Sequence, residues 1–261
     1  MREELKRALL GKGFLFSFLA MFVCIWMRIL PDWLVSADWG EYRPDALHLV
    51  VGSIFFGGIM LILPFCATLT HAVSNVDEIQ TSFIYWKALR SPLQRIARQK
   101  LISTALSGGL CVMLPFVLNI VIWNIVAVPI DPIAYPQHEQ IFYEGVLYND
   151  WYGVMHGLPM YTSMSLGIFL NGALWALVGL AVSVWLPDKL LVMTMPIGIY
   201  FLWMRDLPNR LFGVTIPHPS DLFNDGLTME VLVQALIATG VSLLLAIAVY
   251  YTGLKRRVQH G

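Results

Sequence analysis

Charged side chains are scarce in this sequence. Asp, Glu, Lys and Arg make up 13% of its 261 residues, whereas 57% are hydrophobic and the mean hydropathy is +0.67. Soluble domains carry about a quarter charged residues, because a surface that faces water needs them. The shortage excludes an ordinary soluble domain and predicts a chain whose exterior is covered mostly by lipid.

Motifs for chemistry are also missing. The three cysteines (Cys24, Cys66 and Cys111) lie in apolar runs without a CxxC pair or a nearby histidine. They therefore indicate packing residues, not a disulfide framework or a zinc site. No Walker A loop, dinucleotide fingerprint or kinase signature occurs. We expect no catalytic residue, metal or cofactor on this chain and no nucleic-acid partner. Any uphill transport would draw its energy from another protein.

The sequence does contain apolar stretches about as long as the roughly 20 residues that cross a bilayer. They cover residues 14–32, 48–70, 101–128, 161–186, 188–204 and 231–254. The predicted fold class is therefore all-α, with one polytopic membrane domain of six transmembrane helices over residues 1–261. The first stretch is too long for a cleavable signal peptide, so we expect it to stay as an anchor. Residues 161–204 predict a hairpin that turns at 186–189, with one long kinked helix as the alternative.

The distribution of Lys and Arg predicts the orientation. Of the 17 Lys and Arg residues, 13 fall in the N-terminus, the 71–100 loop, the 187–189 turn and the C-terminus. Because basic residues concentrate in cytoplasmic loops, both termini are predicted to be cytoplasmic. Segment 1–13 predicts an amphipathic helix along the cytoplasmic membrane surface, with a frayed basic tail as the alternative.

The predicted cytoplasmic loop 71–100 is more elaborate than a simple connection requires. Asp77 and Glu78 follow two capping residues, which predicts that they occupy the first turn of a new helix. An aromatic cluster spans Phe83–Trp86, and Pro92 predicts the start of the next helix. This mixture is typical of a docking site for another protein. The alternative is a solvated basic loop that binds lipid headgroups.

Four polar residues lie within the predicted spans: Asn119, Asn124, Asn171 and Gln234. Polar groups in hydrocarbon need partners, so these side chains are expected to pack between helices or to line a translocation path. The outer loop 129–160 carries histidines and carboxylates, among them His138 and His156. Their spacing matches no ligand motif, so a surface or re-entrant helix is the default expectation for this loop.

Residues Leu61–Asn119 contain, in order, a proline-bearing end of the second span, the acidic pair Asp77–Glu78, and the basic residues Arg98 and Lys100. Ser-Gly-Gly and Leu-Pro then follow within the third span. In this order of features, and in the plan of an amphipathic N-terminal helix with six spans, the chain resembles the membrane subunits of type 2 ABC exporters of Gram-positive bacteria. The short signature of the polysaccharide branch of that family is not found.

The resemblance implies a permease subunit of the bacterial cytoplasmic membrane, which pairs with a second copy or a paralogue. It also implies a separate soluble ATPase that holds ATP and Mg and docks on the 71–100 loop. The implied docking residues are Asp77, Glu78, Phe83, Tyr85, Trp86 and Arg90. The expected function is export of a peptide or amphiphilic compound. The alternatives are a membrane-embedded enzyme that uses the outer-loop histidines and carboxylates, and a non-transporting binding or immunity subunit.

Overall fold

The computed structural model describes residues 2–38, 46, 49–50, 52–53, 59–127, 158–204, 218–223 and 228–260. Within these ranges all regular structure is helical, as the composition predicts. Residues 128–157, which make up nearly all of the predicted outer loop, lie outside the described part of the chain, and so do His138 and His156.

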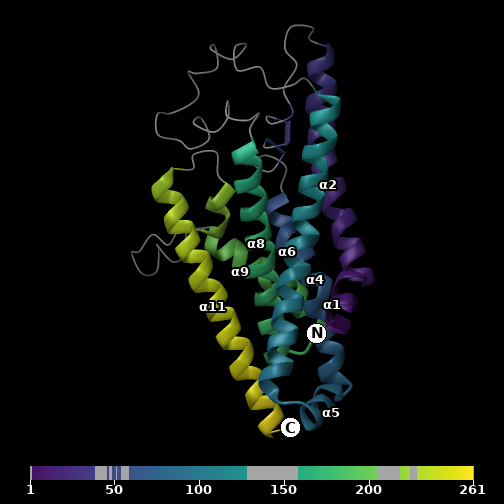
Figure 1. Cartoon of the computed structure of the whole chain (residues 1–261), viewed down its shortest axis with the longest axis vertical. Helices are drawn as coiled ribbons and strands as arrows, with labels where there is room; N and C mark the ends of the chain where they lie inside the picture. The colour runs from purple at the N-terminus through teal and green to yellow at the C-terminus, as the bar shows by residue number, and fades with distance from the viewer. Residues whose placement is uncertain are drawn as a thin grey trace.

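Long helices lie side by side along the vertical axis of Figure 1. In chain order the described elements are α1 (Arg2–Leu9), α2 (Lys12–Asp38), α4 (Ile59–Gln80), α5 (Phe83–Arg90), α6 (Leu93–Val126), α8 (Leu158–Trp185), α9 (Lys189–Met204), η2 (Pro219–Phe223) and α11 (Met229–His260). The short helix α5 and the last turns of α11 lie together at the bottom of the figure. We call this the basal end of the bundle.

Five of the described helices are long and apolar enough to cross a membrane, namely α2 with its α1 lead-in, α4, α6, α8 and α11. The sixth predicted span, α9, has 16 residues and a length of about 24 Å, short of the roughly 30 Å of hydrocarbon. The hairpin prediction is confirmed, because α8 ends at Trp185 and α9 begins at Lys189. The Asp188 carboxylate accepts the Leu191 N–H at 3.0 Å, which caps the start of α9.

Helix α8 lies at the centre of the bundle and is the most buried of the long helices. It meets α6 at glycines whose missing side chains allow close approach. A Cβ built on Gly172 would lie 2.4 Å from Val112 Cγ2 and 2.6 Å from the Gly108 carbonyl oxygen. Both distances are shorter than a real Cβ tolerates, so the two backbones are in direct contact here.

Replacing Gly172 with alanine is therefore expected to destabilise the protein by about 1–3 kcal/mol, because the added methyl group forces the α6 and α8 backbones apart. Thermal unfolding of the purified protein in detergent measures the effect. Gly240→Ala on α11 is the matched control, since nothing lies within 4 Å of a Cβ at that position. Equal melting temperatures for the two variants would contradict the close packing.

The short helix η2 packs against the middle of α8. Asn171 lies about 21 Å along α8 from its basal end, and its side-chain amide donates to the Pro219 carbonyl oxygen of η2 at 2.7 Å. The ring of His218 packs edge-on against Tyr200 and Trp203 of α9.

Candidate functional site

The segment predicted as a cytoplasmic loop is almost entirely helical. Helix α4 continues to Gln80, α5 follows after a two-residue turn, and α6 begins at Leu93 directly after Pro92. The start of α6 was predicted correctly. The prediction that Asp77 and Glu78 open a new helix is wrong, because they lie in the last turn of α4. Buried residues at helical spacing (Ala72, Val76 and Ile79) hold α4 against the bundle to this point.

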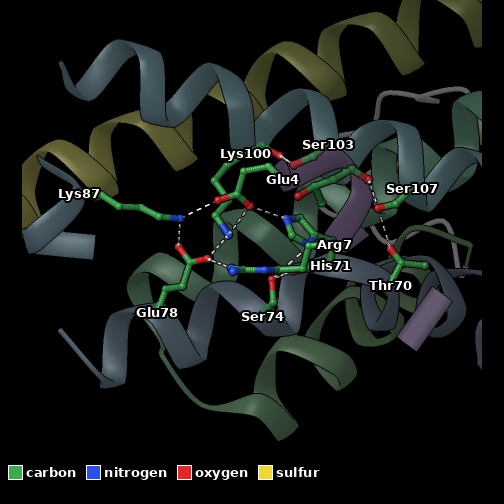
Figure 2. A network of polar contacts seen from close by, with 11 residues as sticks. Glu4, Arg7, Thr70, His71, Ser74, Glu78, Lys87, Lys100, Ser103 and Ser107 are labelled. Atoms are coloured by element: carbon green, nitrogen blue, oxygen red, sulfur yellow. Dashed lines mark hydrogen bonds and ion pairs between the residues drawn. The ribbon is translucent and has the colours of Figure 1, made fainter. Parts of the chain in front are cut away.

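Four charges, two buried and two partly buried, form a closed ring at the basal end (Figure 2). Each comes from a different helix: Glu4 from α1, Glu78 from α4, Lys87 from α5 and Lys100 from α6. The Lys87 ammonium lies 2.6 Å from Glu4 Oε1 and 3.1 Å from Glu78 Oε2. The Lys100 ammonium lies 2.7 Å from Glu78 Oε1 and 3.5 Å from Glu4 Oε2. Opposite charges alternate around this charge ring, so each carboxylate contacts both lysines.

The charge ring is balanced and removed from solvent. Lys100 exposes 1% of its side chain, Glu78 7%, Glu4 14% and Lys87 24%. Two carboxylates and two ammoniums give a net charge of zero, and a buried charge without such compensation costs several kcal/mol. The charge ring therefore joins α1 to the consecutive helices α4, α5 and α6, whose ring residues lie about 70 or more residues later in the sequence.

Further polar groups extend from the charge ring. The guanidinium of Arg7, whose side chain is 58% exposed, contacts Glu78 Oε1 at 3.2 Å. His71 Nε2 lies 3.6 Å from Glu4 Oε2, and the Ser74 hydroxyl lies 3.2 Å from His71 Nδ1. Because Glu4 points inward and Ala8 is buried, α1 packs on α4 and α6 and covers the charge ring (Figure 2).

The outer face of α5 is apolar and exposed. Phe83 is 44% exposed, Trp86 61% and Leu89 80%, and their spacing of three residues places them on one side of the helix. Ile84 on the opposite side is buried in the bundle. Lys87 connects α5 to the charge ring and lies 4.9 Å from the centroid of the Phe83 ring. We call Phe83, Trp86 and Leu89 the α5 stripe.

No family model, curated protein or solved structure matches this chain. Its function is therefore inferred from its own geometry.

The predicted docking residues differ in how exposed they are to solvent. Phe83, Trp86 and Arg90 are exposed, as a docking role requires, whereas Tyr85 is half-buried. Glu78 is buried in the charge ring and forms its ion pairs within the chain, so its contact with a partner stays a prediction that its burial does not favour.

Asp77 is half-exposed and pairs with Lys189 at 2.6 Å, which fastens α4 to the start of α9. In the same corner, the Gln80 amide donates to the Pro187 carbonyl oxygen at 2.8 Å. Asp77 therefore has a partner within the chain, on the hairpin turn between α8 and α9.

The four polar residues of the spans do not share one path. Asn119 donates to the Pro115 carbonyl oxygen at 2.7 Å, and Asn124 donates to the Tyr161 hydroxyl at 3.2 Å. Asn171 binds η2, and Gln234 donates to the Glu230 carboxylate on its own helix at 3.0 Å. These contacts fit local packing roles better than a continuous lining.

Sequence reasoning missed Glu4, Lys87 and Lys100 as site residues. The sequence signal for them was a lysine, Lys100, directly before an apolar span. Acidic residues in two other segments, Glu4 and Glu78, were the candidates to pair with it.

Proposed function

We propose that this protein is the membrane subunit of an ATP-driven ABC exporter and that a separate soluble ATPase docks on the α5 stripe. The observation that carries the proposal is the α5 stripe itself: three large apolar side chains point away from the bundle at the basal end. Exposed aromatic side chains of this kind form the centres of protein interfaces, where Trp is among the most enriched residues.

The charge ring supports a coupling role for α5. A displacement of α5 moves the Lys87 ammonium, which lies within 3.1 Å of carboxylates on α1 and α4. Glu78 and Glu4 in turn hold Lys100 of α6. Separating any of these groups leaves a buried charge without compensation, so the four helices are expected to move as one body.

In this proposal the basal end is cytoplasmic, α9 completes six spans, and both termini lie inside the cell. The ATPase binds ATP and Mg, and a second copy or a paralogue of this chain completes the transporter. Export of a peptide or amphiphilic compound follows from the family resemblance alone. The chain itself acts as a permease without its own chemistry.

Purification from native membranes in mild detergent, followed by mass identification of the bound proteins, tests the proposal. We expect a soluble ATPase at a fixed ratio to the chain, with ATP hydrolysis that this chain stimulates. A homo-oligomer without a nucleotide-binding protein, even after cross-linking, would contradict the exporter and favour a binding or immunity subunit.

A further inference from the structure

A second built feature lies at the basal end, where α8 meets α11. The indole of Trp185, the last residue of α8, lies directly on the α11 backbone at Gly253. A Cβ at Gly253 would come within 2.7 Å of the indole nitrogen. The indole N–H donates to the Val249 carbonyl oxygen at 3.2 Å. Glycine at position 253 therefore provides the space in which this ring is held, with 43% of the residue still exposed.

Two arginines of α11 surround the end of α8. Arg257 donates to the Val184 carbonyl oxygen and, at 3.4 Å, to the Trp185 carbonyl oxygen. These are carbonyl groups that a helix C-terminus leaves without partners. The Arg256 guanidinium lies 5.7 Å from the centroid of the Trp185 ring, within the range of a cation–π contact. Side chains lean toward the N-terminus of their helix, so these cations point back toward the apolar part of α11.

We propose that this corner binds the headgroup of an anionic phospholipid. Lys255 and Arg256 are both exposed, and within the described part of the chain no carboxylate forms an ion pair with them. The site lies where an apolar span ends, beside the exposed apolar side chains of Leu186 and Val249. Trp and basic residues at that level are typical headgroup contacts. Acyl chains would cover the apolar neighbours, whereas an acidic protein surface would leave them uncovered.

The test uses the full chain in nanodiscs that contain phosphatidylcholine and a small fraction of a brominated lipid. The measured signal is the fluorescence of Trp185, taken as the difference between the wild-type chain and a Trp185→Phe variant. We expect brominated phosphatidylglycerol to quench this signal at an about 30-fold lower mole fraction than brominated phosphatidylcholine, since Lys255 and Arg256 each contribute about 1 kcal/mol near the surface. The double variant Lys255→Gln, Arg256→Gln is expected to lose this preference.

The double variant Arg95→Gln, Arg98→Gln on α6 is the matched control, because both of its arginines are exposed at the same end of the bundle. It is expected to keep the preference of the wild-type chain. Gly253→Ala, which displaces the indole, is expected to lose the preference with all charges intact. Equal quenching by the two lipids in the wild-type chain would overturn the site. An equal loss of lipid preference in the two double variants would also overturn it. So would a Lys255→Gln, Arg256→Gln variant that keeps its lipid preference and loses the binding of another protein.

Discussion

Replacing Lys100 with methionine is expected to destabilise the protein by about 3 kcal/mol and to lower its melting temperature by the order of 10 °C. Methionine fills the space of the lysine side chain but removes the ammonium that lies between Glu78 and Glu4. In the described part of the chain the two carboxylates then share Lys87, which is 24% exposed, and Glu78 also contacts Arg7, which is 58% exposed. Thermal unfolding in detergent, followed by size-exclusion chromatography, measures the loss.

A second substitution distinguishes the charge ring from a simple packing defect. In the double variant Lys100→Met, Glu78→Gln the charge ring is neutral again, with the 2.6 Å pair of Lys87 and Glu4 intact. We expect this variant to recover at least half of the lost stability, which corresponds to a coupling energy of about 1.5 kcal/mol or more. Lys189→Met, which breaks a half-exposed pair with Asp77, is the control and is expected to cost less than about 1 kcal/mol. Additive losses in the double variant would contradict the charge ring.

Under the docking proposal, replacing Trp86 with alanine is expected to remove nearly all stimulated ATP hydrolysis at an ATPase concentration that half-saturates the wild-type chain, while the chain still inserts into the membrane and folds. Trp86 is 61% exposed at the centre of the α5 stripe, so its removal leaves the core unchanged. Truncation of a central interface tryptophan typically costs about 2 kcal/mol or more, which weakens partner binding roughly 30-fold. Titration of the copurifying ATPase against the reconstituted variant measures both the affinity and the stimulated rate.

Phe16→Ala on α2 is the control for this substitution. Phe16 is 59% exposed, nearly as much as Trp86, but it lies on the side of a spanning helix. We expect it to leave stimulation unchanged. If Trp86→Ala keeps wild-type stimulation, α5 does not carry the docking surface.

Much of the fold follows from local sequence signals. Apolar stretches of spanning length predict the long helices, Pro187 with Asp188 predicts the hairpin turn, and Pro92 predicts the start of α6. Each signal is local, because hydrophobic length and proline geometry act within one element. The span count remains a prediction, since α9 is short and the residues between α2 and α4 are described only in part.

The end of α4 shows why the loop was predicted wrongly. Ser74 and Asn75 before an acidic pair are typical of a helix start. In the structure the Ser74 hydroxyl donates back to the His71 carbonyl oxygen at 2.7 Å, and the Asn75 amide donates to the Ser183 hydroxyl at 2.8 Å. The Ser74 hydroxyl is therefore satisfied within the continuing helix. The Asn75 amide finds its partner on α8, more than a hundred residues away in the sequence.

The charge ring has no local signature for the same reason. Glu4 and Lys100 are 96 positions apart and meet only because α1 folds back onto α6. The sequence predicted Glu78 as a docking residue that faces away from the bundle, because an acidic residue near a basic segment is usually solvated. Phe83 and Trp86 of the α5 stripe were predicted, since aromatic residues in a polar segment are conspicuous without a structure, whereas the exposed Leu89 was missed.

The most direct test of the docking proposal is photo-cross-linking from position 86 in native membranes. A benzophenone amino acid replaces Trp86 in one variant and Phe16 in the other, and the cross-linked products are identified by mass spectrometry. We predict that position 86 captures a soluble ATPase and that position 16 captures none. Lipid alone at position 86, or the same products from both positions, would contradict the role of α5 as the docking helix.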